Sequence, residues 1–179
     1  RLQKRILSRA RSLGMKPVLP GFSGHIPEAL VKEYPGLKHH TMEWWGFGPT
    51  YTLDWEDPMF LKISRIFMRK QQELYGADHY YNIDPFNEMT PPSRDRDYIT
   101  NMAKTIFSCI NESDPEGVWV LMTWFCKNPQ PEAFWSAERT EMFFNAVPDD
   151  RMLALELWGD NWSGTGWYRQ EGWYNKPWV

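Results

Sequence analysis

The chain has 179 residues, and its 20 basic residues nearly balance 23 acidic ones, for a formal charge of −3. This balance provides no basic surface for nucleic acid and no polybasic membrane anchor, and no apolar run reaches the roughly 18 residues of a membrane span. Aromatic residues make up 16% of the chain, which suits stacking on a sugar ring. Cys109 and Cys126 lack metal-ligand spacing, and the sequence predicts neither a metal nor another cofactor.

The sequence of residues 1–75 predicts three helices, one strand and one long loop. In chain order we expect a helix over 1–13, a buried strand over 15–20, a short helix over 27–34, a long aromatic loop over 37–57 and a helix over 58–75. The helices have recognisable boundaries, since Gly14 stops the first, Asp57 caps the last and Gly76 ends it.

The second half alternates regularly between strand and helix. In chain order we expect a strand over 77–86, a helix over 96–114, a strand over 117–124, a helix over 131–147 beginning at Pro131, a strand over 151–160 and the start of another over 176–179. Such alternation is typical of parallel strands joined by crossover helices.

Alternation alone does not separate a doubly wound sheet from a barrel. No glycine-rich phosphate loop follows any predicted strand, which removes the main support for a nucleotide site. Polar and aromatic groups follow the strands instead, namely Phe22, His25, Asn87, Glu88, Trp124, Trp158 and Asp160. Functional groups of a (β/α)8 barrel collect at that edge. We therefore predict an α/β fold, a partial TIM-type (β/α)8 barrel of roughly four to five βα units.

The segment YNIDPFNEMTPPS, residues 81–93, places a carboxylate directly after a predicted strand. Glycoside hydrolysis normally uses two carboxylates, one of which protonates the departing oxygen. Glu88 is suitably placed to be that acid/base, and the amide of Asn87 could bind a sugar hydroxyl or N-acetyl group. A capped surface turn is the alternative interpretation of this segment.

A second carboxylate is predicted from the alternation along residues 151–160. We expect Leu153, Leu155 and Leu157 to face the helices, so that Met152, Ala154, Glu156 and Trp158 point into the barrel. Glu156 would then be an interior carboxylate near the functional edge, where it either contacts substrate or serves as a buried structural acid.

Four segments together resemble the catalytic barrel of the α-N-acetylglucosaminidases, glycoside hydrolase family 89. They are GMKPVLPGFSGHIPEAL, DHYYNIDPFNEMTPPS, VLMTWF and RMLALELW. The resemblance implies exo-acting, retaining removal of terminal α-linked N-acetylglucosamine from glycans such as heparan sulfate. It also implies a lysosomal protein if the source is an animal, and a secreted or extracytoplasmic one if it is bacterial.

The resemblance assigns roles residue by residue. Glu88 resembles the acid/base and Asn87 its neighbouring substrate contact, while Trp124 and either Trp45 or Trp44 resemble aromatic residues that line the sugar pocket. No segment resembles the family's nucleophile. The resemblance therefore implies that residues 1–179 are the central part of one catalytic domain, with both ends of the barrel and the nucleophile elsewhere, and that the isolated piece is nearly inactive. Because an open part-barrel leaves strand edges unpaired, we also expect the isolated piece to be poorly soluble or oligomeric.

Two alternatives remain open at this stage. The tryptophan-rich loops could belong to a carbohydrate-binding module without catalytic activity, or the chain could be a βα-barrel glycosidase of another specificity.

Overall fold

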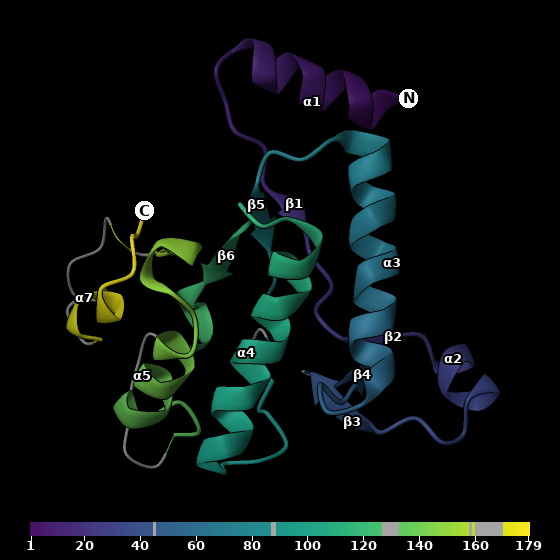
Figure 1. Ribbon diagram of the computed structural model, residues 1–179. Helices are drawn as coiled ribbons and strands as arrows, with labels where there is room; N and C mark the ends of the chain where they lie inside the picture. Colours follow the sequence, from purple (N-terminus) through teal and green to yellow (C-terminus); the bar gives the residue numbers. More distant parts are fainter. Residues whose placement is uncertain (45, 87–88, 127–132, 158, 160–169) are drawn as a thin grey trace.

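Four parallel strands and the helices that connect them form the main body of the protein. The computed structural model describes residues 1–44, 46–86, 89–126, 133–157, 159 and 170–179. The main sheet has the order β1-β5-β6-β7, and α3, α4 and α5 lie side by side along it (Figure 1). Neighbouring strands of this sheet are also consecutive βα units, as in a segment of a barrel.

The strands of the main sheet are short. They are β1 (Leu19–Pro20), β5 (Tyr80–Asn82), β6 (Val118–Met122) and β7 (Met152–Leu155). Each lies inside its predicted range, and the additional predicted residues are mostly loop. The chain end also pairs with β7, since Ala154 forms a parallel bridge with Trp178.

The helices largely follow their predicted boundaries. They are α1 (Leu2–Ser12), α2 (Glu28–Glu33), α3 (Pro58–Tyr75), α4 (Arg96–Ser113), α5 (Ala137–Asn145) and the short α7 (Glu171–Tyr174), with 3₁₀ turns η1 (Thr123–Cys126) and η2 (Asp149–Arg151). At the start of α3, the Asp57 side chain accepts a hydrogen bond from the Met59 backbone N–H, as its sequence predicts.

Helix α5 starts later than predicted. Pro131 lies outside the described residues, and the helix begins at Ala137 after Ser136, whose side chain accepts a hydrogen bond from the Arg139 N–H. The hydroxyl oxygen of a capping serine accepts a hydrogen bond from a free backbone N–H of the first helical turn. A proline at the first helical position has no side-chain acceptor that could do so. The serine is therefore the true start signal.

Residues 37–57 are not a loop, contrary to the prediction. They contain a hairpin of β3 (His39–Trp44) and β4 (Phe47–Leu53), which β2 (His25–Ile26) extends to a three-stranded antiparallel sheet in the order β2-β4-β3. Gly46, Gly48 and Pro49 lie near the turn and a register shift after Met42, where a strand tolerates them.

A row of buried side chains crosses the main sheet and faces the helices. Leu19, Tyr81, Trp119 and Met152 are paired across the four strands and are at most 5% exposed. The Trp119 ring packs edge-on against Phe143 of α5, with centroids 5.5 Å apart. This row therefore marks the helix-facing side of the sheet.

The predicted facing of β7 is reversed. Met152 and Ala154 are fully buried in register with Trp119 and Leu121 on the helix side, whereas Leu153 is only half-buried. Both faces of a parallel barrel strand are apolar, so alternation within the strand does not reveal which face meets the helices.

Candidate active site

The carboxyl ends of the four parallel strands meet at one edge of the sheet, here called the rim. Asp84 follows β5 by two residues, Trp124 lies in the 3₁₀ turn after β6, and Glu156 directly follows β7. His25 follows β1 and begins β2. The structure thus brings acidic, aromatic and imidazole groups to a single edge, as expected for a barrel active site.

Several predicted site residues lie outside the described part of the chain. These are Asn87, Glu88 and Trp45, together with the rim candidates Trp158 and Asp160. Trp44 is the last residue of β3, opposite Phe47 across the hairpin turn. The assignments of all these residues stay predictions.

The residues on either side of Asn87 and Glu88 are firmly anchored. The Met89 N–H donates a hydrogen bond of 2.7 Å to the Phe86 carbonyl, and Phe86 is 5% exposed and packs against Trp135. Before them, the carbonyl of Ile83 accepts a 2.8 Å hydrogen bond from the Trp119 indole. The described residues before Asn87 and Glu88 are therefore held in the core, and Met89 after them packs partly buried against it.

Glu156 is buried at the rim, with 6% of its surface exposed. The alternation that predicted it to point into the barrel is reversed in β7, so its contact with substrate stays a prediction. Its backbone N–H donates to the Val179 carbonyl at 2.8 Å. Burial raises the pKa of the nearby Cys126 thiol, and the negative charges of Glu156 and Asp84 raise it further. Cys126 is consequently a protonated, unreactive thiol.

Asp84 was not predicted as a site residue, and His25 was noted only for its position after a strand. Desolvation lowers the pKa of His25 below its ordinary value, while the negative charge of Asp84 opposes that effect. The signal for Asp84 was present in the sequence as a carboxylate two residues beyond a strand. It was overlooked because Glu88 follows it so closely.

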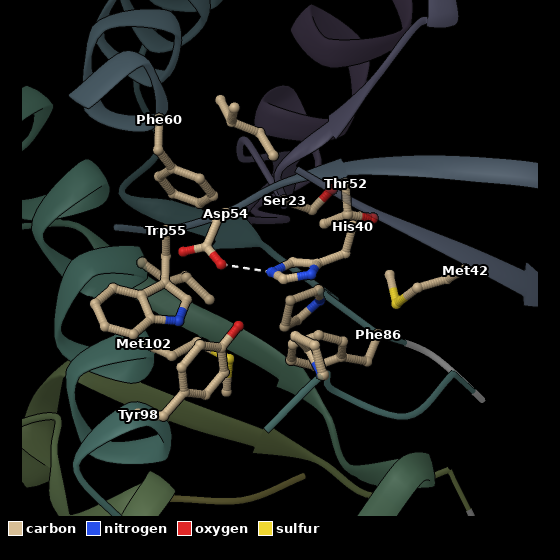
Figure 2. A pocket seen from close by; sticks show the side chains of 14 residues that line it. Ser23, His40, Met42, Thr52, Asp54, Trp55, Phe60, Phe86, Tyr98 and Met102 are labelled. Carbon is tan, nitrogen blue, oxygen red and sulfur yellow. Dashed lines mark hydrogen bonds and ion pairs between the residues drawn. The ribbon is translucent and has the colours of Figure 1, made fainter. Parts of the chain in front are cut away.

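A separate small pocket, partly open to solvent, lies between the hairpin and the rim. Figure 2 shows it lined by side chains of both regions, including Ser23, His40, Asp54, Trp55, Phe86 and Tyr98. Its free volume is about 20 Å³, enough for little more than one water molecule. That free volume is smaller than a sugar ring.

Within the described ranges, no three His, Cys, Asp or Glu side chains form a group that could hold a metal ion. None of the described helices is both long and apolar enough to cross a membrane.

Comparison with known proteins identifies the relatives of this chain. Residues 1–179 match the model of the alpha-N-acetylglucosaminidase (NAGLU) TIM-barrel domain. The chain belongs to this family. Human alpha-N-acetylglucosaminidase is 37% identical to it over 165 residues, which are 89% of this chain and 22% of the human protein. The chain thus spans about a fifth of the length of its curated relative.

Solved structures of the same family share the fold. A family 89 glycoside hydrolase from Clostridium perfringens, in complex with 2-acetamido-1,2-dideoxynojirmycin, has a TM-score of 0.78 and 24% identity, covering 97% of this chain and 19% of that one. The same bacterial protein in complex with PUGNAc has a TM-score of 0.79 at the same identity and coverage. The expected fold, a partial TIM-type barrel from the alpha-N-acetylglucosaminidase family, is confirmed.

Proposed function

We propose that this chain belongs to a retaining, exo-acting α-N-acetylglucosaminidase and supplies its general acid/base, Glu88. The chain spans a minor part of its relatives, so the activity is proposed for the intact protein. Family membership supports the reaction class. A Clostridium perfringens relative, with two glutamates replaced by glutamine, was solved with its substrate GlcNAc-alpha-1,4-galactose, and two essential carboxylates are what a glycosidase mechanism needs.

The observation that carries the proposal is that the described residues on either side of Asn87 and Glu88 contact the core. Ile83 accepts the Trp119 hydrogen bond, Phe86 is buried, and Met89 packs partly buried against the core. These contacts, directly after β5, support a catalytic role for this segment, since a general acid must stay within hydrogen-bonding reach of the departing oxygen.

In the proposed reaction, Glu88 donates its proton to the glycosidic oxygen as the sugar leaves, and a second carboxylate attacks the anomeric carbon. Glu88 then removes a proton from the water that releases the sugar, so the configuration is retained. Asn87 and Trp124 bind the N-acetylglucosamine ring, together with Trp45 or Trp44, and Glu156 provides a further polar contact. The nucleophile is supplied by another part of the intact protein, and heparan sulfate is the proposed glycan if the source is an animal.

The test compares the intact wild-type protein with Glu88→Gln on aryl α-N-acetylglucosaminides. We expect kcat to fall by about 10²–10⁴-fold, because general acid catalysis is worth that much, while affinity for an iminosugar inhibitor is kept. The loss should be smaller for a dinitrophenyl leaving group, which needs little protonation. Glu116→Gln is the matched control, since the Glu116 side chain is 80% exposed just before β6, and its kcat should not change.

Other outcomes identify the alternatives. Sugar binding without any turnover by the wild-type protein would indicate a carbohydrate-binding module. Turnover of a different aryl glycoside would indicate a glycosidase of another specificity. Retention requires that the α-anomer of N-acetylglucosamine appears first by NMR, and a β-anomer first would disprove that part of the proposal.

A further inference from the structure

A histidine–aspartate pair joins the two strands of the hairpin. His40 Nε2 lies 2.5 Å from Asp54 Oδ2, and Asp54 is only 6% exposed. The other oxygen of Asp54 accepts the Glu56 backbone N–H at 2.7 Å. The Asp54 N–H donates to the Lys38 carbonyl at 2.8 Å, so side chain and backbone of Asp54 are both fixed.

The pair faces the segment that leads to Glu88. His40 and Asp54 line the small pocket together with Pro85, Phe86 and Pro92, which flank Asn87 and Glu88 in the sequence. Figure 2 shows the imidazole and the carboxylate joined by a hydrogen bond in the pocket that Phe86 also lines. One wall of the pocket is therefore the hairpin, and another is the chain on either side of the proposed acid/base.

A second connection runs across the small sheet. Thr52 of β4 is paired with His40 on one side and with His25 on the other, and its hydroxyl lies 3.5 Å from His25 Nδ1. His25 in turn experiences the negative charge of Asp84. His40, Thr52 and His25 are thus neighbours across the small sheet. They connect the buried Asp54 with Asp84 in the loop after β5.

We propose that His40 and Asp54 are positioning residues, which fix the hairpin against Pro85, Phe86 and Pro92, and that the activity of Glu88 depends on this contact. This inference rests on the proposed function. The role is one of positioning because the Asp54 carboxylate is buried and bound to His40 and to the Glu56 backbone. Removing one partner would leave a buried group unpaired, and a 1 Å displacement of a catalytic group can cost about 10²-fold in rate.

The opposite edge of the sheet provides a matched control. His79 Nδ1 lies 2.9 Å from Asp114 Oδ2, and Asp114 Oδ1 accepts the Glu116 N–H at 3.2 Å. The carboxylate side chains of Asp54 and Asp114 are 8% and 7% exposed. The two pairs are thus alike in chemistry and in the burial of the carboxylate. His79 and Asp114, however, precede β5 and β6 and so lie at the amino ends of the strands, opposite the rim.

The experiment measures kcat and KM of the intact protein for Asp54→Asn and Asp114→Asn. We expect both variants to melt at a lower temperature than wild type. Only Asp54→Asn should lower kcat, by roughly 10–100-fold with KM changed by less than about threefold, since a displaced acid impairs the reaction more than binding. His40→Gln keeps an N–H donor and should retain more activity than His40→Leu, which provides a second test if Asp54→Asn does not fold.

The contrary outcomes are distinct. Equal losses of kcat in Asp54→Asn and Asp114→Asn, or equal activity of His40→Gln and His40→Leu, would overturn the positioning role and leave the proposed function intact. A wild-type protein that turns over no aryl α-N-acetylglucosaminide overturns the proposed function, and this inference with it.

Discussion

The hydroxyl of Tyr81, in the centre of the main sheet, donates a 2.7 Å hydrogen bond to the carboxylate of Asp114 at the end of α4. His79 binds the same carboxylate. Burial alone would raise the pKa of Asp114, but the hydrogen bonds from Tyr81 and His79 prevail and lower it below its ordinary value. Burial also raises the pKa of Tyr81 to about 12, so its hydroxyl remains a donor at neutral pH.

The first prediction concerns stability at acid pH. Because the pKa of Asp114 is lower in the folded state, its contribution is complete above the unfolded value of about 3.9 and disappears as pH falls through the folded pKa. Asp114→Asn should therefore reduce the free energy of unfolding by about 1–3 kcal/mol at pH 7 and by less at pH 2–3. Urea titrations of wild type and variant at pH 7 and at pH 2–3 measure this difference in the free energy of unfolding. An equal difference at the two pH values would contradict the prediction.

The second prediction concerns the glycine that follows β1. A Cβ at Gly21 would lie 2.4 Å from Cγ1 of Ile83, a side chain that is 1% exposed. Gly21→Ala should thus lower the free energy of unfolding by about 1–3 kcal/mol through overpacking. Gly36→Ala is the control, since a Cβ there meets nothing within 4 Å. Equal urea midpoints for the two variants would show that the Ile83 side chain shifts to accommodate the added methyl group without loss of stability.

The third prediction concerns the aromatic residue after β6. Trp124 is half-buried in η1 at the rim, and the proposed function makes it a stacking surface for the sugar. Trp124→Ala in the intact protein should raise KM by about tenfold, the effect of losing a contact of some 1.4 kcal/mol. Tyr80→Ala removes a half-buried aromatic side chain at the start of β5. If both raise KM alike, Trp124 has no specific role in binding.

The tryptophan content shows how far composition can mislead about function. Trp119, Trp135 and Trp173 are at most 6% exposed and belong to the core. Trp173 stacks on Phe144 with ring centroids 5.6 Å apart. Large rings fill cores as readily as they line sugar sites, so the abundance of tryptophan did not by itself distinguish these uses.

Local signals in the sequence located the helices well. Helix α3 has its predicted residues, from Pro58 after the Asp57 cap to Tyr75 before Gly76, and α4 differs from its prediction by one residue. Caps and a 3.6-residue period act within a few residues of one another. The exception, α5, was misplaced because Pro131 was preferred to the Ser136 cap.

The sequence by itself determined the alternation of strands and helices, the family, and the segment that carries the proposed acid/base. Only the tertiary structure decided that residues 39–53 form a hairpin, that Met152 and Ala154 face the helices, and that His40 meets Asp54 beside Phe86. Helix signals come from neighbouring residues, whereas strand pairing and facing depend on partners far away in the chain, which a local pattern does not contain.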